Sequence, residues 1–259
     1  MKRRGLLEVY SVCALVFLYL PILVLAVYSF NRSRYSAAWC GFTLDWYSRL
    51  WSSRAIQSAA LNSLIVAAAS SLLATSLAVS AALAQERFSW KRKAWLQASF
   101  LLPVVVPELM MAVGFLLLFG LLGAGGGLPA LILGHTTLNL PIVWLIVRAR
   151  LSRLDPRLEE AAMDLGATRG QAFWKVTVPL LMPAVLGGGL MAFAVSLDDF
   201  VISFFLNAPN STTLPVQIYS MIKFSMSPVV NALTTVLFAA SVLLVVAAWV
   251  LQERRDAHA

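Results

Sequence analysis

Six long apolar stretches dominate this sequence, and each is long enough to cross a lipid bilayer as a helix. Crossing a hydrocarbon layer of about 30 Å at about 1.5 Å per residue takes about 20 mostly apolar residues, because every backbone polar group must be bonded within the segment. The sequence therefore predicts an all-α integral membrane protein with six transmembrane helices. Their expected bounds are 9–30, 61–84, 96–122, 129–150, 184–206 and 229–251.

The composition and the short connections leave no room for a soluble domain. Hydrophobic residues make up 60% of the 259 residues and charged residues only 12%, whereas a soluble domain carries about 25% charged residues. The longest connection between the apolar stretches, 151–183, is too short to fold as a soluble domain of its own. We therefore expect a single transmembrane domain over residues 1–259.

Positive charges are unevenly distributed between the two sides of the membrane. The chain has 20 Lys and Arg residues against 12 Asp and Glu residues. With the N-terminus inside the cell, 15 of the 20 basic residues fall on the cytoplasmic side, which obeys the positive-inside rule. We expect a multi-pass protein with both termini in the cytoplasm, and the basic balance then needs no nucleic-acid partner.

Residues that could carry out chemistry are few. The two cysteines, Cys13 and Cys40, and the two histidines follow no ligand spacing, so we expect no metal site. The sequence has no G-x-x-x-x-G-K-[S/T] loop, so this chain is not expected to bind ATP. It also has no recognisable nucleophile and base pair, so we expect no catalytic residues and no resident cofactor.

The connection 151–183 carries the local signals of two short helices. Asp155 and Pro156 are a typical helix start, and Gly166 is a typical stop. Thr168, followed three residues later by Gln171, has the spacing of a capping box and predicts the start of a second helix. A narrow apolar stripe with two alanines at its centre follows one side of the first helix. That helix either packs on the membrane or its own bundle, or binds another protein.

The spacing of residues 160–179 resembles the E-A-A loop of permeases from ATP-binding cassette (ABC) importers. The segment reads Glu-Ala-Ala, three residues, Gly, nine residues, Val, one residue and Val-Pro. The resemblance implies a type I importer permease (MetI-like) fold, a coupling helix in this loop, and a partner ATPase subunit that binds ATP and Mg²⁺. This chain would be a non-catalytic subunit. The residues expected to contact the ATPase are Glu160, Ala161, Ala162 and Gly166.

Three acidic residues fall inside the predicted spans: Glu108, Asp198 and Asp199. A carboxylate near the bilayer centre costs about 2.5–3.5 kcal/mol on insertion scales, so such groups usually face a cavity, a partner charge or a pathway. No Lys or Arg lies near the middle of a span, and at about 1.5 Å per residue Glu108 and Asp198 lie at similar depths. We therefore expect these three acids to line a pathway for cations.

The positions of these acids predict further local geometry. Adjacent residues of a helix diverge by about 100°, so we expect one of Asp198 and Asp199 to face the path and the other a neighbouring helix or subunit. Pro103 and Pro107 precede Glu108 and should weaken the helix there. The alternative is that the acids are protonated, or that they only hold helices together by bonding to Ser196, Ser203 or Asn139.

Four segments carry a narrower resemblance: 107–112, 196–203, 214–223 and 227–233. They are similar to permease subunits of spermidine/putrescine (polyamine) ABC importers, of the PotC or PotI type. This resemblance implies a bacterial inner membrane location, a heterodimer with a second permease, two ATPase subunits and a periplasmic polyamine-binding protein. Position 108 carries Glu where Asp is equally expected, which leaves the preferred polyamine open.

Two other functions fit six membrane helices with embedded acids. The same kind of importer could carry another small solute, although an anion permease should place Lys or Arg at mid-membrane. An ion-coupled secondary transporter could use the acids as proton relays, but it would not need an E-A-A loop. We expect the permease subunit of an ATP-driven polyamine importer.

Overall fold

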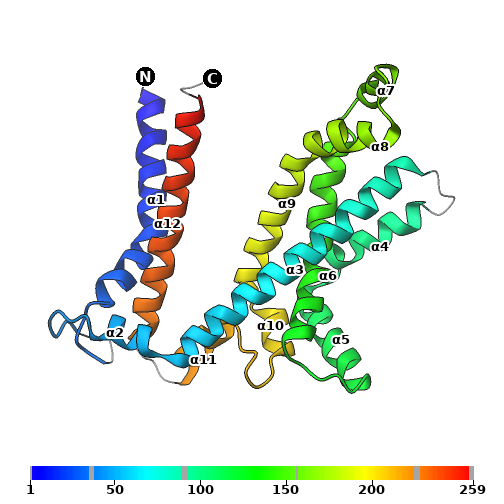
Figure 1. The fold of residues 1–259 in the computed structure, drawn as a ribbon. Coiled ribbons are helices and arrows are strands. Elements are labelled where there is room, and N and C mark those ends of the chain that lie inside the picture. The colour runs from blue at the N-terminus through cyan, green and yellow to red at the C-terminus, as the bar shows by residue number, and fades with distance from the viewer. Residues whose placement is uncertain (1, 35–37, 89–92, 156, 225–227, 257–259) are drawn as a thin grey trace. The chain divides into compact units, whose positions relative to one another are not determined.

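The computed structural model describes residues 2–34, 38–88, 93–155, 157–224 and 228–256, and the regular elements of this part of the chain are helices. An isolated antiparallel bridge joins Asn31 and Phe42. The all-α fold class is confirmed. The helices (Figure 1) are α1 (Lys2–Tyr28), α2 (Asp45–Ser52), α3 (Arg54–Arg87), α4 (Lys93–Val105), α5 (Glu108–Leu121), α6 (Leu128–Leu151), α7 (Arg157–Asp164), α8 (Arg169–Ala172), the π-helix η1 (Phe173–Thr177), α9 (Val178–Asp198), α10 (Val201–Leu206), α11 (Leu214–Phe224) and α12 (Val229–Asp256).

Several of these helices are long and apolar enough to cross a membrane. Within the described residues four qualify alone: the part Glu8–Tyr28 of α1, then α3, α6 and the stretch Arg169–Asp198. The bent pair α4 and α5 makes a fifth if it counts as one span, and α12 adds a shorter apolar helix, Val229–Leu243. These helices fall on the six apolar stretches of the sequence.

The third apolar stretch is not one continuous helix. Instead of a helix over 96–122, the chain forms α4 and α5, which are bent by 105° relative to each other. Pro107 stands at the break in an extended conformation, because proline has no backbone N–H to donate and its ring clashes with a preceding helical turn. Pro103 is accommodated inside α4.

The fifth apolar stretch is also interrupted. The helix expected over 184–206 begins earlier, at Val178, and ends at Asp198, and Val201 starts the separate helix α10. Asp199 lies between the two helices with extended backbone angles, φ −63° and ψ 124°. The expectation of one continuous helix over 184–206 is therefore wrong, because α9 ends at Asp198.

The chain forms two compact units, Met1–Gln57 with Ile218–Ala259, and Ser58–Gln217. In the first unit α1 and α2 both pack against α12. Trp46 of α2 is buried there, and its indole N–H donates to the backbone carbonyl of Asn31 at 2.8 Å. The second unit contains every residue for which the sequence predicts a function.

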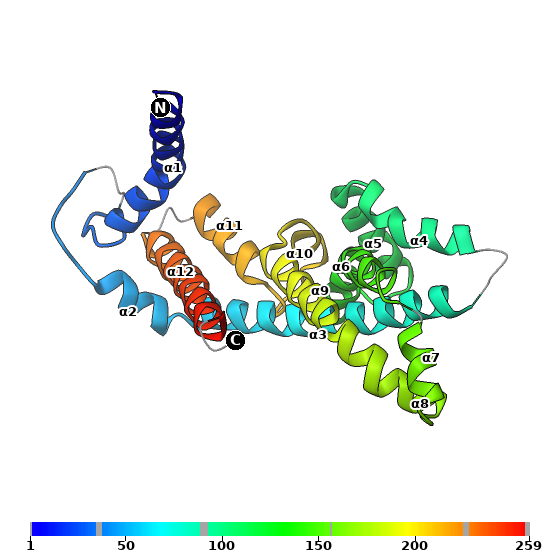
Figure 2. The ribbon, with the colours of Figure 1, turned by 90° about the horizontal axis from the view of Figure 1, so that it is seen from above.

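The helix α6 is central to the second unit. It packs against α9, α4, α10 and α5, and Figure 2 shows α6 among α5, α9 and α10. One apolar cluster along α6 contains Leu131 and Ile202, and a second contains Val143 and Trp144. Between these clusters α6 carries His135 and Asn139, which are both fully buried. A polar layer therefore interrupts the apolar core.

Small residues allow the helices of this unit to pack closely. Lipid tails are as apolar as leucine, so helices in a membrane associate through close packing rather than through the hydrophobic effect. Ala74, Ala78 and Ala82 lie at every fourth position of α3 and are almost completely buried. At Gly134 of α6 a Cβ atom would lie 2.8 Å from Ile202 Cγ2, so only glycine permits this approach of α10.

Candidate functional site

Asp199 lies at the junction between α9 and α10 and is buried. Its carboxylate accepts hydrogen bonds from the backbone N–H groups of Ile202, at 3.4 Å, and Ser203, at 2.9 Å. These N–H groups belong to the first turn of α10 and have no partner within that helix. The carboxylate of Asp199 therefore caps α10 and stabilises the interruption of the span.

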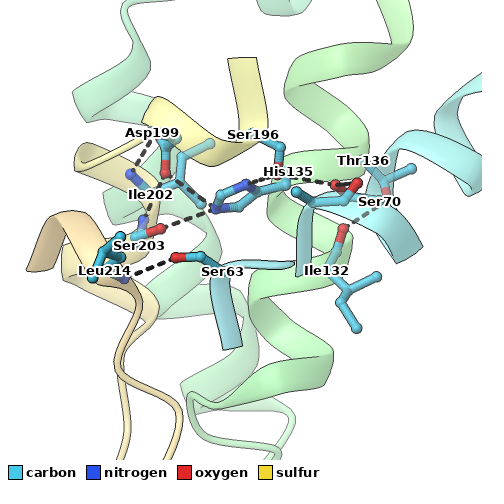
Figure 3. Close-up of polar contacts among 11 residues, drawn as sticks. Ser63, Ser70, Ile132, His135, Thr136, Ser196, Asp199, Ile202, Ser203 and Leu214 are labelled. Atoms are coloured by element: carbon cyan, nitrogen blue, oxygen red, sulfur yellow. Dashed lines mark hydrogen bonds and ion pairs between the residues drawn. The ribbon is translucent and has the colours of Figure 1, made fainter. Parts of the chain in front are cut away.

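His135 of α6 connects Asp199 to the neighbouring helices (Figure 3). Its Nε2 lies 3.1 Å from Asp199 Oδ2 and 3.1 Å from Ser203 Oγ, and its Nδ1 lies 2.6 Å from Ser196 Oγ. Ser196 of α9 is in turn 3.1 Å from Ser70 of α3, between the two hydroxyl oxygens. Side chains from α3, α6, α9 and α10 therefore meet in one buried polar network.

Glu108 approaches this network from α5. It is the first residue of α5, directly after Pro107, it is half-buried, and its carboxyl group is close enough to that of Asp199 to interact with it electrostatically. Two carboxylates at such range repel each other unless a proton or another cation lies between them. The break at Pro107 thus brings together two acids that are far apart in the sequence.

Asp198, in contrast to its neighbour, is exposed. It is the last residue of α9, where the free backbone carbonyls give a helix a negative end. The carboxylate of Asp198 adds to this negative potential, which is unfavourable unless a cation or water offsets it. The three acids predicted from the sequence are therefore positioned by two helix breaks, one acid enclosed, one half-buried and one exposed.

The reading in which the acids hold helices together applies to Asp199, although through different partners than expected. The backbone N–H of Ser203, not its hydroxyl, donates to the carboxylate of Asp199. The hydroxyl of Ser196 contacts His135 rather than Asp199 itself. The side chain of Asn139 has no hydrogen-bond partner among the described residues. Sequence reasoning missed His135 because it considered histidine only as a metal ligand. A lone histidine in an apolar span that also contains buried serines was the available signal.

The E-A-A loop, residues 151–183, forms the short helices expected from its sequence. Asp155 Oδ1 accepts the backbone N–H of Arg157 at the start of α7, while Pro156 lies outside the described residues. Gly166 follows α7 with a φ of +93°, which favours glycine. Thr168 and Gln171 form both bonds of the capping box at α8. The predicted helix start at Asp155, the stop at Gly166 and the capping box at Thr168 are confirmed.

The surface of this loop is open and partly apolar. Glu160, Ala161 and Gly166 are exposed, and Ala162 is half-buried. Nearby, the Leu165 side chain is 90% exposed. Exposed apolar side chains next to small residues are typical of a protein contact surface.

No metal centre is evident in the part of the chain that the structure describes. Its His, Cys, Asp and Glu side chains form no group of three or more that could hold a metal ion. The two described cysteines, Cys13 and Cys40, are exposed and unbonded.

Comparison with known families accounts for these features together. The family described as "Binding-protein-dependent transport system inner membrane component" matches residues 74–256, which include the three acids and the E-A-A loop. This chain belongs to that family. It is therefore an inner membrane component of a binding-protein-dependent transport system.

Two relatives within the family are similar over nearly their whole length. The chain is 40% identical over 231 residues to the spermidine/putrescine transport system permease protein PotC of Escherichia coli (strain K12), covering 89% of this chain and 88% of PotC. It is 36% identical over 247 residues to the putrescine transport system permease protein PotI of the same strain, and this match covers 93% of this chain and 88% of PotI. The chain is thus a homologue of polyamine permeases, which are non-catalytic membrane subunits.

A solved structure shares the fold. It is the bacterial alginate ABC transporter in complex with an alginate pentasaccharide-bound periplasmic protein, with a TM-score of 0.69 and 20% identity, covering 96% of this chain and 93% of that chain. At this identity the likeness establishes the fold alone. The ABC importer permease fold expected from the E-A-A loop is confirmed.

Proposed function

We propose that this chain is the transmembrane permease subunit of an ATP-driven polyamine importer and forms half of the translocation path. The observation that carries the proposal is the 40% identity to PotC over 88% of that protein, in a chain whose apolar stretches contain three acids. Its N- and C-termini face the cytoplasm, as the distribution of Lys and Arg favours.

Glu108, Asp198 and Asp199 supply the negative charge of the path. An ammonium group about 4 Å from a carboxylate gains about 1 kcal/mol in water and about 4 kcal/mol at an effective dielectric constant of 20. A polyamine carries several such groups on a linear chain, so separated carboxylates suit it better than one carboxylate. The exposed Asp198 meets the cation first, and Glu108 near Asp199 provides two further acids whose repulsion an ammonium group relieves.

The partners follow from the same assignment. A second permease completes the path as a heterodimer, a periplasmic polyamine-binding protein delivers the substrate, and a dimer of ATPase subunits binds ATP and Mg²⁺. Glu160, Ala161, Ala162 and Gly166 contact the ATPase. Support for this contact comes from the exposed surface of α7 and from the cap at Gly166, which gives the loop a defined shape.

Transport in proteoliposomes tests the proposal. The complex of this chain with its second permease, ATPase and binding protein is reconstituted, and ATPase stimulation and uptake are measured with putrescine, spermidine, spermine and a neutral organic solute. We expect ATP-dependent uptake of at least one polyamine and no response to the neutral solute. Stimulation by a different solute alone would contradict the polyamine assignment, and uptake driven by a proton gradient without ATP would instead support a secondary transporter.

A further inference from the structure

His135 is a fully buried ionisable side chain that the proposed function does not use. It lies within α6, eight positions into a helix that is otherwise largely apolar. Placing an imidazole in such surroundings is costly unless its nitrogens are hydrogen-bonded. Both of its ring nitrogens have partners, which are Ser196 near the end of α9, Ser203 near the start of α10, and Asp199 between these helices.

The hydrogen bonds of the ring have a defined direction. A carboxylate can only accept, so His135 Nε2 carries the proton that is donated to Asp199. With Nε2 as the donor of a neutral ring, Nδ1 accepts from the hydroxyl of Ser196, whose oxygen lies 3.1 Å from that of Ser70. These contacts connect α3, through α9 and α6, to Asp199.

The network holds the junction at which the span is interrupted. Asp199 bonds to His135 on one side and to the first turn of α10 on the other, so its carboxylate is fixed in position. Its backbone leaves the helical conformation at this residue, which turns Asp199 inward while the preceding Asp198 stays exposed at the end of α9. The orientation of Asp198 therefore depends on how firmly Asp199 is held.

A second buried polar residue shows that burial in α6 alone does not produce this arrangement. Asn139 lies one turn after His135 and is equally buried, but its amide has no partner among the described residues. Of the two fully buried polar side chains of α6, His135 is the one connected to an acid of the path.

From these contacts we infer that His135 is a positioning residue of the cation path: it holds the α9–α10 junction through Asp199 and thereby orients Asp198, without touching the cation. The inference rests on the proposed function. Because the periplasmic protein captures the substrate, loss of this positioning lowers the maximal rate of transport and leaves the half-saturating concentration unchanged.

Variants of His135 in the complete reconstituted complex test this role. His135→Leu removes both ring bonds, and we expect a decrease of about tenfold or more in maximal polyamine uptake, because a hydrogen bond to a buried charged group is lost. His135→Gln can donate to Asp199 and accept from Ser196, so it should restore uptake to within about threefold of the wild type. Asn139→Leu, a matched polar-to-apolar change one turn away, should transport at the wild-type rate.

A double variant shows whether His135 acts through Asp199. If it does, His135→Leu combined with Asp199→Asn is no slower than the slower single variant, because both changes break the same contact. The inference would be overturned if the double variant were slowed by the product of the two single-variant factors. Wild-type uptake by His135→Leu, or equal decreases in uptake for His135→Leu and His135→Gln, would also overturn it. Complex yield and basal ATPase activity are measured for every variant to separate positioning from assembly.

Ser196→Ala decides the question if His135→Leu does not assemble. It keeps the ring and removes one bond that orients it, so a decrease of about threefold supports the inference and wild-type uptake overturns it. Failure of the proposed function would appear in the wild-type complex as absence of polyamine uptake. Failure of this inference would appear as wild-type rates in the variants of a complex that does transport polyamine.

Discussion

The guanidinium of Arg87, the last residue of α3, lies 2.6 Å from the carboxylate of Glu159 in α7, 72 residues away in the sequence. The same carboxylate accepts the hydroxyl of Thr177 in η1, and the guanidinium carbon lies 4.7 Å from the ring centroid of Phe173. Arg87 and Glu159 thus connect a long helix of the bundle to the E-A-A loop.

Exchanging the two charges tests whether this ion pair is needed to couple the E-A-A loop to the transmembrane helices. Arg87→Glu or Glu159→Arg alone should lower substrate-stimulated ATPase activity about two- to fivefold, because a partly exposed pair is worth about 0.2–1 kcal/mol and like charges then face each other. The double exchange should restore stimulation, since opposite charges meet again. Equal stimulation in the wild type and both single variants would exclude a role of the pair in coupling.

Neutralising the acids of the path should slow polyamine flux. We expect Asp198→Asn and Glu108→Gln each to lower the maximal uptake rate about tenfold or more, because each loses a carboxylate contact to a desolvated ammonium group. Membrane insertion and complex yield should be unchanged, as both side chains keep their size. Asp45→Asn, an exposed acid at the start of α2, serves as the control. Wild-type uptake by both single variants and by their combination would contradict the assignment.

Replacing Gly166 should disturb the E-A-A loop. Gly166→Ala places an L residue at a φ of +93°, at a cost of about 1–2 kcal/mol, and should lower ATPase stimulation by the loaded binding protein. Gly170→Ala is the matched control, because neither position has an atom within 4 Å of an added Cβ and only Gly166 has positive φ. An equal response of the two variants would show that the backbone conformation at 166 does not matter for coupling.

Adding a methyl group at Gly134 should destabilise the second unit. A Cβ there lies 2.8 Å from Ile202 Cγ2 and 3.0 Å from Leu206 Cδ1, so Gly134→Ala should cost about 1–3 kcal/mol through overpacking. Thermal unfolding of the purified complex, followed by size-exclusion chromatography, measures the change. Gly114→Ala in α5 meets no atom within 4 Å and should unfold at the wild-type temperature.

The E-A-A loop shows how far local signals reach. The start at Asp155, the stop at Gly166 and the capping box at Thr168 all involve groups within four residues of one another. Such bonds form from neighbouring backbone and side-chain atoms, so they can be read without knowledge of the fold. The contact of Glu159 with Arg87 could not be read in this way, because it joins distant parts of the chain.

The acids show where local reasoning fails. The run of apolar residues predicts one helix over 184–206, on which Asp198 and Asp199 would lie about 100° apart. A carboxylate that caps the next turn competes with helix continuation, and whether it does so depends on a partner that holds it. That partner is His135, 64 positions earlier in the sequence than Asp199.

The membrane class, the apolar stretches, the short helices of the E-A-A loop and the resemblance to polyamine permeases can all be predicted without a structure, because length, hydropathy and neighbouring residues are sufficient for each. The burial of Asp199, the exposure of Asp198, the approach of Glu108 to Asp199 and the contacts of His135 with neighbouring helices follow from the packing of the folded chain. The physical reason is that hydrogen bonds between buried polar groups form between whichever side chains the packing of small residues brings together, and that packing involves the whole unit.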